Sequence, residues 1–148
     1  MDITALPFNR LVGIERSANE GTVLGLPAGE RYTNHLGTVH AGALLALAEA
    51  TSGECLIAGL RGLGFEVVPV VRRIEAKFRK AAHGAVHSKL GDTGELMREL
   101  REALSAKGRA LVAVPVDVFD ASGTHALAAT VEWFVARSGA SAPADSAP

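Results

Sequence analysis

One apolar stretch constrains the fold of this chain more than any other feature. Between residues 39 and 60 the sequence contains no proline and is dominated by alanine and leucine, which favours one long helix. The apolar positions are spread around the whole circumference of that helix, not along one stripe. A helix that is apolar on all sides belongs in a protein interior. We therefore expect the rest of the chain to wrap around it.

The same stretch has the length of a membrane-spanning helix, but its composition argues for a protein interior. Polar side chains interrupt it at Glu49, Thr51, Ser52 and Glu54. Charged residues are rare in membrane spans because their burial in lipid is costly. The N-terminus shows no basic segment followed by an apolar one, so we expect no signal peptide. No membrane partner is expected.

Size, charge and cysteine content limit the class of protein. A chain of 148 residues can form one domain with its own core, and a formal net charge of −1 gives no reason to expect nucleic acid as a partner. The single Cys55 excludes an internal disulfide and suits the reducing cytoplasm. We expect one cytoplasmic domain over residues 1–137 and a disordered tail over residues 138–148, which has no apolar anchor.

Alternating segments on both sides of the helix predict strands. In residues 73–79 the apolar Ile74, Ala76 and Phe78 alternate with charged residues, which is typical of a half-buried strand. Residues 94–107 predict an amphipathic helix covering a sheet edge. Further strands are expected at residues 12–18, 21–27, 85–90, 110–120 and 125–137, with Pro115 at a bulge or an edge position. A helical turn is expected at residues 5–11, with Leu6, Phe8 and Leu11 packed. Short turns favour antiparallel pairing, so we predict an α+β fold with an antiparallel sheet wrapped around one long central helix.

Glu49 lies in the middle of the expected buried helix. A carboxylate there must find a partner, shift its pKa or serve a chemical purpose. One interpretation makes Glu49 a catalytic base or nucleophile. The other makes it a structural carboxylate, paired with Lys80 or an arginine. Lys80 shares the strand parity of Phe78, so we expect its side chain to point toward the core.

The start of the helix offers hydrogen-bond donors. The first N–H groups of a helix have no intrahelical partner and lie at the positive end of its dipole. The N–H groups of Ala41 and Gly42 are therefore candidate oxyanion donors, and Gly42 permits close approach of a substrate. Asn34 has two possible roles: its side chain bonds a substrate carbonyl or a water molecule, or it only stabilises the loop that contains it. His40 either orients a substrate or bonds a backbone carbonyl at the helix start.

These residues form a pattern that resembles a known family. The pattern is N-x-x-G-T-x-H-x-G with an acid nine residues after the histidine, and stands here as Asn34, Gly37, Thr38, His40, Gly42 and Glu49. Over about residues 10–137 the chain resembles the hot-dog-fold thioesterases, in particular a less characterised branch of the phenylacetyl-CoA-pathway type with an extra helix. The resemblance implies a hot-dog fold, hydrolysis of an acyl-CoA, and no cofactor apart from the coenzyme A moiety of the substrate. In that family the acid is the base or nucleophile, the asparagine and the first helical N–H position the thioester, and the histidine is a supporting residue. We expect Gly37 and Thr38 to contact the substrate.

Two positions depart from the family pattern. Ala41 stands where the family usually has glycine, which adds a methyl group beside the substrate but keeps the N–H. Lys80 stands where the family often has serine or threonine to hold the attacking water. Lys80 and the neighbouring Arg79 either bind phosphates of coenzyme A or belong to a solvated strand face.

The spacing of the pattern predicts a homodimer. His40 and Glu49 are nine residues apart, which is about 13 Å along one helix and too far for both to reach one carbonyl. Two helices related by a two-fold axis bring the start of one to the middle of the other. We expect two composite sites in a dimer or a dimer of dimers, as the resemblance also implies. The acyl chain would then lie along the helix interface, past Leu44, Leu45 and Ala48.

Two other functions remain open. The protein could bind an acyl thioester of coenzyme A or an acyl carrier protein without turning it over. A dehydratase or isomerase on the same fold would need a histidine and an acid in one site. The histidines do not show the two-histidine-plus-acid spacing of a metal-binding helix, so we expect no metal.

Overall fold

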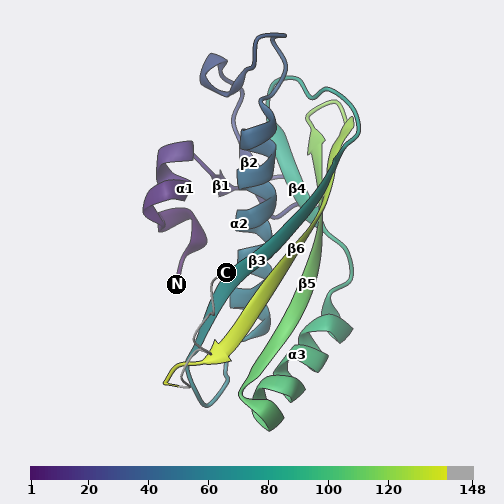
Figure 1. Ribbon diagram of the computed structural model, residues 1–148. Helices are drawn as coiled ribbons and strands as arrows, with labels where there is room; N and C mark the ends of the chain where they lie inside the picture. Colours follow the sequence, from purple (N-terminus) through teal and green to yellow (C-terminus); the bar gives the residue numbers. More distant parts are fainter. Residues whose placement is uncertain (140–148) are drawn as a thin grey trace, which may run out of the picture.

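The computed structural model describes residues 1–139, and Figure 1 shows how their helices and strands are arranged. Most of the tail that the sequence predicts to be disordered, residues 140–148, lies outside the described residues. The elements in chain order are η1 (Ile3–Ala5), α1 (Pro7–Val12), β1 (Glu15–Arg16), β2 (Leu24–Leu26), η2 (Glu30–Tyr32), α2 (Ala41–Gly59), β3 (Val67–Phe78), β4 (Val86–Leu90), α3 (Gly94–Lys107), β5 (Arg109–Asp120) and β6 (His125–Arg137).

The strands form one antiparallel sheet with the order β1-β2-β4-β5-β6-β3. The strands predicted at residues 110–120 and 125–137 agree closely with β5 and β6, whereas β3 begins six residues before the strand predicted at residues 73–79. Strands β1 and β2 are much shorter than the predicted strands at residues 12–18 and 21–27. One reason is that the N–H and the C=O of Leu24 both bond the hydroxyl of Ser88, in place of the backbone of β4.

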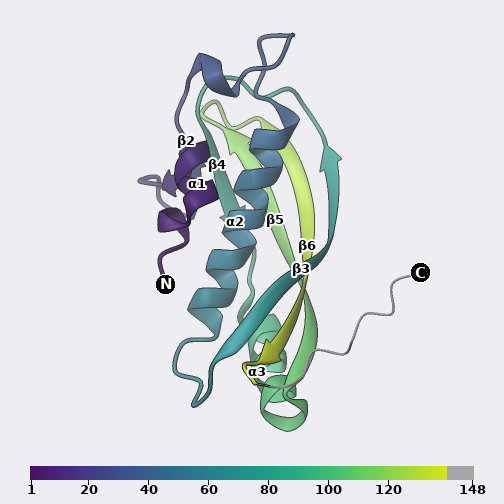
Figure 2. The ribbon, with the colours of Figure 1, turned by 60° about the vertical axis from the view of Figure 1, so that its left-hand side comes forward.

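The long helix α2 lies in the hollow of the curved sheet, as Figures 1 and 2 both show. On β5 every second residue, namely Val112, Val114, Val116 and Val118, is buried in the core that α2 shares. The predicted α+β architecture is therefore confirmed. Within residues 1–139, α2 is the one helix long and apolar enough to cross a membrane, but more than half of it is buried inside the protein.

Two buried hydrogen-bond chains fix α2 on the sheet. The Thr51 hydroxyl lies 2.6 Å from the hydroxyl of Ser88 on β4. The indole N–H of Trp133 on β6 donates to the Ser52 hydroxyl at 3.0 Å, and that hydroxyl donates to the carbonyl of Glu49 at 2.7 Å. Buried polar groups specify position because leaving them unpaired is costly. The turn that carries Glu49 is thus tied directly to the sheet.

The helix is not covered on every side within one chain. Leu45, Ala46 and Glu49 on one flank of α2 are only half-buried. On the same side of the sheet, β3 forms an edge of twelve residues that pairs only with β6. Ile74 and Phe78, on the helix-facing side of this edge, are exposed. An uncovered apolar flank therefore lies beside an open strand edge, which is an arrangement suited to a partner.

The amphipathic helix α3 covers β5 where β4 no longer pairs with it, as the sequence predicts. Its buried residues are Met97, Leu100 and Leu104. The last pair between the two strands joins Leu90 and Val116, so Pro115 lies one residue beyond it. Proline lacks the N–H that a central ladder needs, so its place at this edge confirms the expected position.

The N-terminal segment packs differently from the expectation. Leu6, Phe8 and Leu11, which were expected to pack, are 37%, 60% and 78% exposed, so that expectation is wrong. The buried residues are instead Ile3 and Asn9, and the Asn9 side chain donates to the carbonyl of Ile3 at 2.9 Å. A six-residue helix has room for only one inward face, and here the polar Asn9 occupies it.

Candidate active site

His40 is the N-cap of α2. Its Nδ1 accepts a hydrogen bond from the N–H of Gly42 at 2.9 Å. Because Nδ1 is the acceptor, the proton of the neutral imidazole lies on Nε2, on an exposed side chain that can donate to a ligand. His40 therefore bonds a backbone N–H and not the backbone carbonyl that the sequence suggested as one alternative.

This cap changes the expected oxyanion donors. The N–H of Gly42 already has a partner, so the prediction that it is free to bind an oxyanion is wrong for this conformation. The sequence could not show this because a histidine is not a usual N-cap residue. Within residues 1–139, the N–H of Ala41 has no hydrogen-bond partner. One free donor therefore remains at the positive end of the helix dipole.

Asn34 holds the loop that precedes α2. Its Oδ1 accepts from the N–H groups of Leu36 and Thr38, at 2.9 and 3.2 Å, and its Nδ2 donates to the Thr38 hydroxyl at 2.9 Å. Gly37 supplies the positive φ of 72° that the turn requires. The loop role of Asn34 is thus shown. An amide nitrogen has two hydrogens, so Asn34 also retains one for a ligand.

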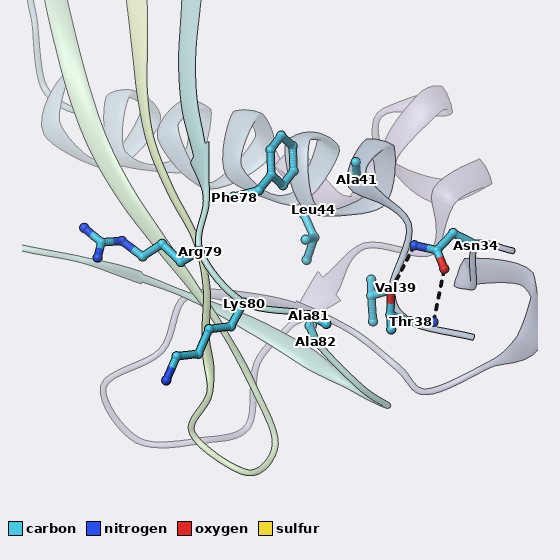
Figure 3. A pocket seen from close by; sticks show the side chains of 10 residues that line it. All are labelled: Asn34, Thr38, Val39, Ala41, Leu44, Phe78, Arg79, Lys80, Ala81 and Ala82. Atoms are coloured by element: carbon cyan, nitrogen blue, oxygen red, sulfur yellow. Dashed lines mark hydrogen bonds between the residues drawn. The ribbon is translucent and has the colours of Figure 1, made fainter. Parts of the chain in front are cut away.

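A small pocket of about 280 Å³ lies beside the first turn of α2. We call it the N-terminal pocket. It is lined by Asn34, Thr38, Val39, Ala41, Leu44, Phe78, Arg79, Lys80, Ala81 and Ala82. Figure 3 shows Asn34 and Thr38 joined by hydrogen bonds on one side, with Arg79 and Lys80 extending outward on the other.

Lys80 does not point into the core, so that prediction is wrong. Strand β3 ends at Phe78, and the parity rule ends with it. The Lys80 side chain is exposed and makes no ion pair with Glu49 in the described chain. The proposed Glu49–Lys80 pair is therefore absent within the protomer over residues 1–139.

Glu49 faces a second, larger hollow of about 730 Å³, which we call the apolar cavity. It is lined by Met1, Ile3, Leu6, Glu49, Gly53, Leu56, Ile57, Leu60, Arg61, Val67, Pro69 and Trp133. The Glu49 carboxylate has no hydrogen-bond or ion-pair partner among the residues that the structure describes. Burial raises the pKa of Glu49, because the charged form loses hydration that nothing replaces.

A second glutamate on α2 has the structural role that the sequence offered for Glu49. Glu54 is 8% exposed, and its Oε1 accepts from Arg16 Nη1 at 3.0 Å. This ion pair ties β1 to the helix. The two glutamates are one turn and a half apart and differ in one decisive respect: only Glu54 has a partner within the described chain.

Of the described residues, none lines both hollows. Glu49 lines the apolar cavity, whereas His40 lines neither hollow and its neighbours Val39 and Ala41 line the N-terminal pocket. His40 and Glu49 therefore do not share a hollow within one protomer, in keeping with their spacing. Leu45 lines neither hollow, and Ala48 is fully buried in the core. The predicted acyl path past Leu44, Leu45 and Ala48 is thus closed at Ala48. The apolar cavity was not predicted, because its walls come from segments far apart in sequence; the one local signal was Gly53 within a helix.

Within residues 1–139, no three histidine, cysteine, aspartate or glutamate side chains lie close enough together to hold a metal ion. The chemistry that this arrangement offers depends on one carboxylate, one free helical N–H and one imidazole N–H.

The chain belongs to the family called Domain of unknown function DUF4442, which matches residues 12–135. No curated protein matches it.

Solved structures of similar fold carry more information. One is a protein of unknown function from Pseudomonas aeruginosa, named a probable thioesterase, with 22% identity and a TM-score of 0.74 over 92% of this chain and 91% of that chain. A thioesterase from Haemophilus influenzae has 18% identity and a TM-score of 0.64, over 91% of this chain and 86% of that one. A Bacillus halodurans protein with CoA has 19% identity and a TM-score of 0.63, over 86% of this chain and 74% of that chain. These likenesses confirm the predicted hot-dog fold of the thioesterase type.

Proposed function

We propose that this protein is a homodimeric hydrolase that cleaves an acyl-CoA thioester into a free acid and a thiol, with the cytoplasm as its location. The observation that carries the proposal is the Glu49 carboxylate, half-buried and without a partner in residues 1–139 at the wall of an apolar cavity. Burying a charge without compensation is costly, and Glu54 shows how this fold pairs a structural carboxylate, through Oε1 with Arg16. An unpaired, desolvated carboxylate in a hollow is typical of acid–base sites.

The second copy completes the site along the β3 edge. Two such edges related by a two-fold axis pair in antiparallel fashion, so the end of one strand lies near the start of the other. The N-terminal pocket adjoins Phe78 at the end of β3, and the apolar cavity adjoins Val67 and Pro69 at its start. Pairing would therefore bring the N-terminal pocket of one protomer to Glu49 of the other. It would also cover the exposed Ile74.

The reaction then follows from the groups that meet. Glu49 accepts a proton from water while the water oxygen bonds the thioester carbonyl carbon. The Ala41 N–H of the opposing protomer donates to the resulting oxyanion, and the Nε2–H of His40 orients the thioester. When the carbon–sulfur bond breaks, the thiolate takes the proton from Glu49. Direct attack by Glu49 to form an anhydride, which water then hydrolyses, gives the same products.

The phosphates of coenzyme A have candidate partners at the rim of the N-terminal pocket. Arg79 and Lys80 line this pocket and extend outward from it (Figure 3). Guanidinium and ammonium groups are the usual phosphate ligands in proteins. The Bacillus halodurans protein of similar fold carries CoA, which supports this class of substrate. No bound cofactor is needed for the reaction.

One observation favours a second candidate, binding of an acyl thioester without turnover. Gly42 N–H and most of the Asn34 amide are already engaged, which leaves fewer oxyanion donors than a hydrolase commonly uses. A binding protein would need no such donors.

A substrate panel separates these functions. Purified protein is mixed with acetyl-, octanoyl-, palmitoyl- and phenylacetyl-CoA and with an enoyl-CoA, and free thiol is followed with a chromogenic reagent. The hydrolase requires thiol release that Glu49→Gln abolishes while the dimer persists. Saturable binding with no thiol release would establish the binding protein instead, and conversion of an enoyl-CoA without thiol release would indicate a dehydratase.

A further inference from the structure

The walls of the apolar cavity come from opposite parts of the chain. Ile3 and Leu6 of the N-terminal segment form one side, and Trp133 of β6 lines the other. Figure 1 shows the N-terminal segment on one side of α2 and most of β6, within the sheet, on the other. The volume of the apolar cavity, about 730 Å³, is within the range of about 300–1,000 Å³ typical of small-molecule sites.

Gly53 lies on the helix side of this cavity and lets Ile3 pack closely against α2. A Cβ atom at this position would lie 3.2 Å from Ile3 Cδ1 and 3.8 Å from the Trp133 ring. Glycine weakens a helix interior relative to alanine, so its presence here has a spatial reason. A larger side chain at position 53 would occupy the space between the two walls.

The distribution of charge limits what the cavity can hold. Among the described side chains that line it, only those of Glu49 and Arg61 are charged, and Arg61 is exposed. Met1, which also lines it, carries an α-ammonium group and is 88% exposed. The rest of the lining is apolar apart from the indole N–H of Trp133, which Ser52 already accepts. An apolar group with a neutral polar end next to Glu49 fits these walls, whereas a carboxylate beside Glu49 would be repelled.

We propose that the apolar cavity binds the acyl group of the substrate and selects apolar chains of medium length, with the N-terminal segment as the wall that sets the length. This inference rests on the proposed hydrolase, because it takes Glu49 as the group next to the thioester. After hydrolysis the acid product carries a carboxylate, and repulsion from Glu49 favours its release. The neutral thioester meets no such repulsion.

The test uses S-alkyl-CoA thioethers from ethyl to hexadecyl, which bind without being hydrolysed. Trp133 is the single tryptophan of the chain, so its emission reports binding at the cavity wall. Each added methylene should tighten binding by about fourfold until the cavity is filled, since each buried methylene contributes a constant increment. A dissociation constant that is independent of chain length would overturn the proposal.

Matched variants locate the wall. Leu6→Phe should narrow the cavity, move the plateau to shorter chains and weaken decyl-CoA binding by about tenfold. Leu11→Phe makes the same change on an exposed leucine outside the cavity and should leave every affinity unchanged. Gly53→Val gives an independent narrowing from the helix side, checked for folding by circular dichroism. Equal behaviour of Leu6→Phe and Leu11→Phe would contradict the assignment.

The outcome is distinguishable from failure of the proposed function. Length-dependent binding without thiol release from decanoyl-CoA would keep the acyl site and remove the hydrolase. If kcat/KM for thiol release were independent of acyl-chain length in both the wild type and Leu6→Phe, the hydrolase proposal would stand and the acyl-site proposal would be wrong.

Discussion

The two hollows along α2 are built in opposite ways. The N-terminal pocket is small, and its Asn34 and Thr38 are bonded to each other, while the neighbouring His40 caps α2. The apolar cavity is more than twice as large, and its one half-buried carboxylate, Glu49, is left without a partner in the described chain.

This difference indicates a division of labour. A loop whose hydrogen bonds are already made is rigid and can orient a polar thioester with few free donors. A desolvated carboxylate among apolar walls is a stronger base than an exposed one and lies where an acyl chain would be. Among the described residues, the N-terminal pocket has no carboxylate, and the apolar cavity has no loop that could orient the thioester. The following changes test that division, beginning with the largest expected effect.

Removal of the carboxylate should have the largest effect on activity. Glu49→Gln should lower kcat by about a thousandfold, because it removes the general base, and should leave the free energy of unfolding unchanged or raise it. Thiol release and thermal unfolding measure the two quantities.

Glu54→Gln is the matched control on the same helix. It breaks the pair with Arg16 and should lower the free energy of unfolding by about 1–3 kcal/mol while kcat stays near wild type. If the two glutamine variants showed these effects in reverse, the roles assigned to the two glutamates would be wrong.

The free N–H of Ala41 is next in order. Ala41→Pro should lower kcat by about a hundredfold, since it deletes one oxyanion donor. The fold should tolerate it, because proline suits the first helical position and His40 before it is already extended, with φ −63° and ψ 138°.

Ala41→Gly retains the N–H and should retain kcat within a few-fold. Equal losses in Ala41→Pro and Ala41→Gly, measured as kcat with octanoyl-CoA, would show that the N–H has no catalytic role.

Ser52 should affect stability more than chemistry. Ser52→Ala removes the acceptor of the Trp133 indole N–H and should lower the free energy of unfolding by about 1–3 kcal/mol. Its bond to the Glu49 carbonyl is also lost, so kcat should fall by less than tenfold. Urea unfolding followed by Trp133 emission measures the first effect. An unchanged urea midpoint would show that the hydrogen bonds through Ser52 do not fix α2 on the sheet.

The pH profile of the wild type should show the smallest effect. Burial raises the pKa of Glu49 above its usual 4.5, so the acid limb of kcat/KM should lie at higher pH than for an exposed glutamate. The charged form bears the cost of burial. Wild type should therefore be less stable than Glu49→Gln above the raised pKa, and the difference should vanish as the pH falls below about 4.5. An acid limb at the ordinary value would place Glu49 in solvent.

The elements with strong local signals were predictable from the sequence. The helix α2, the amphipathic α3 and the long strands β5 and β6 agree with their predicted ranges to within two residues, because each carries a long periodic pattern. The short strands β1 and β2 were overestimated. Their pairing depends on the Ser88 hydroxyl, about sixty residues away in sequence, which no local pattern reports.

The candidate site shows the same limit. The sequence drew attention to Asn34, His40 and Glu49, and their spacing correctly separated the last two within one chain. It did not predict that His40 would engage the Gly42 N–H, because side-chain rotamers at a cap depend on the loop before it. It also placed Lys80 inward, since the end of β3 two residues earlier was not apparent.

The most direct test of the composite site is a heterodimer of two inactive variants. Glu49→Gln and Ala41→Pro are co-expressed with different tags, and the mixed dimer is isolated by tandem affinity purification. If each site takes Glu49 from one protomer and the Ala41 N–H from the other, the mixed dimer has one intact site and should recover about half of the wild-type kcat per dimer. A mixed dimer as inactive as its parents would contradict the account.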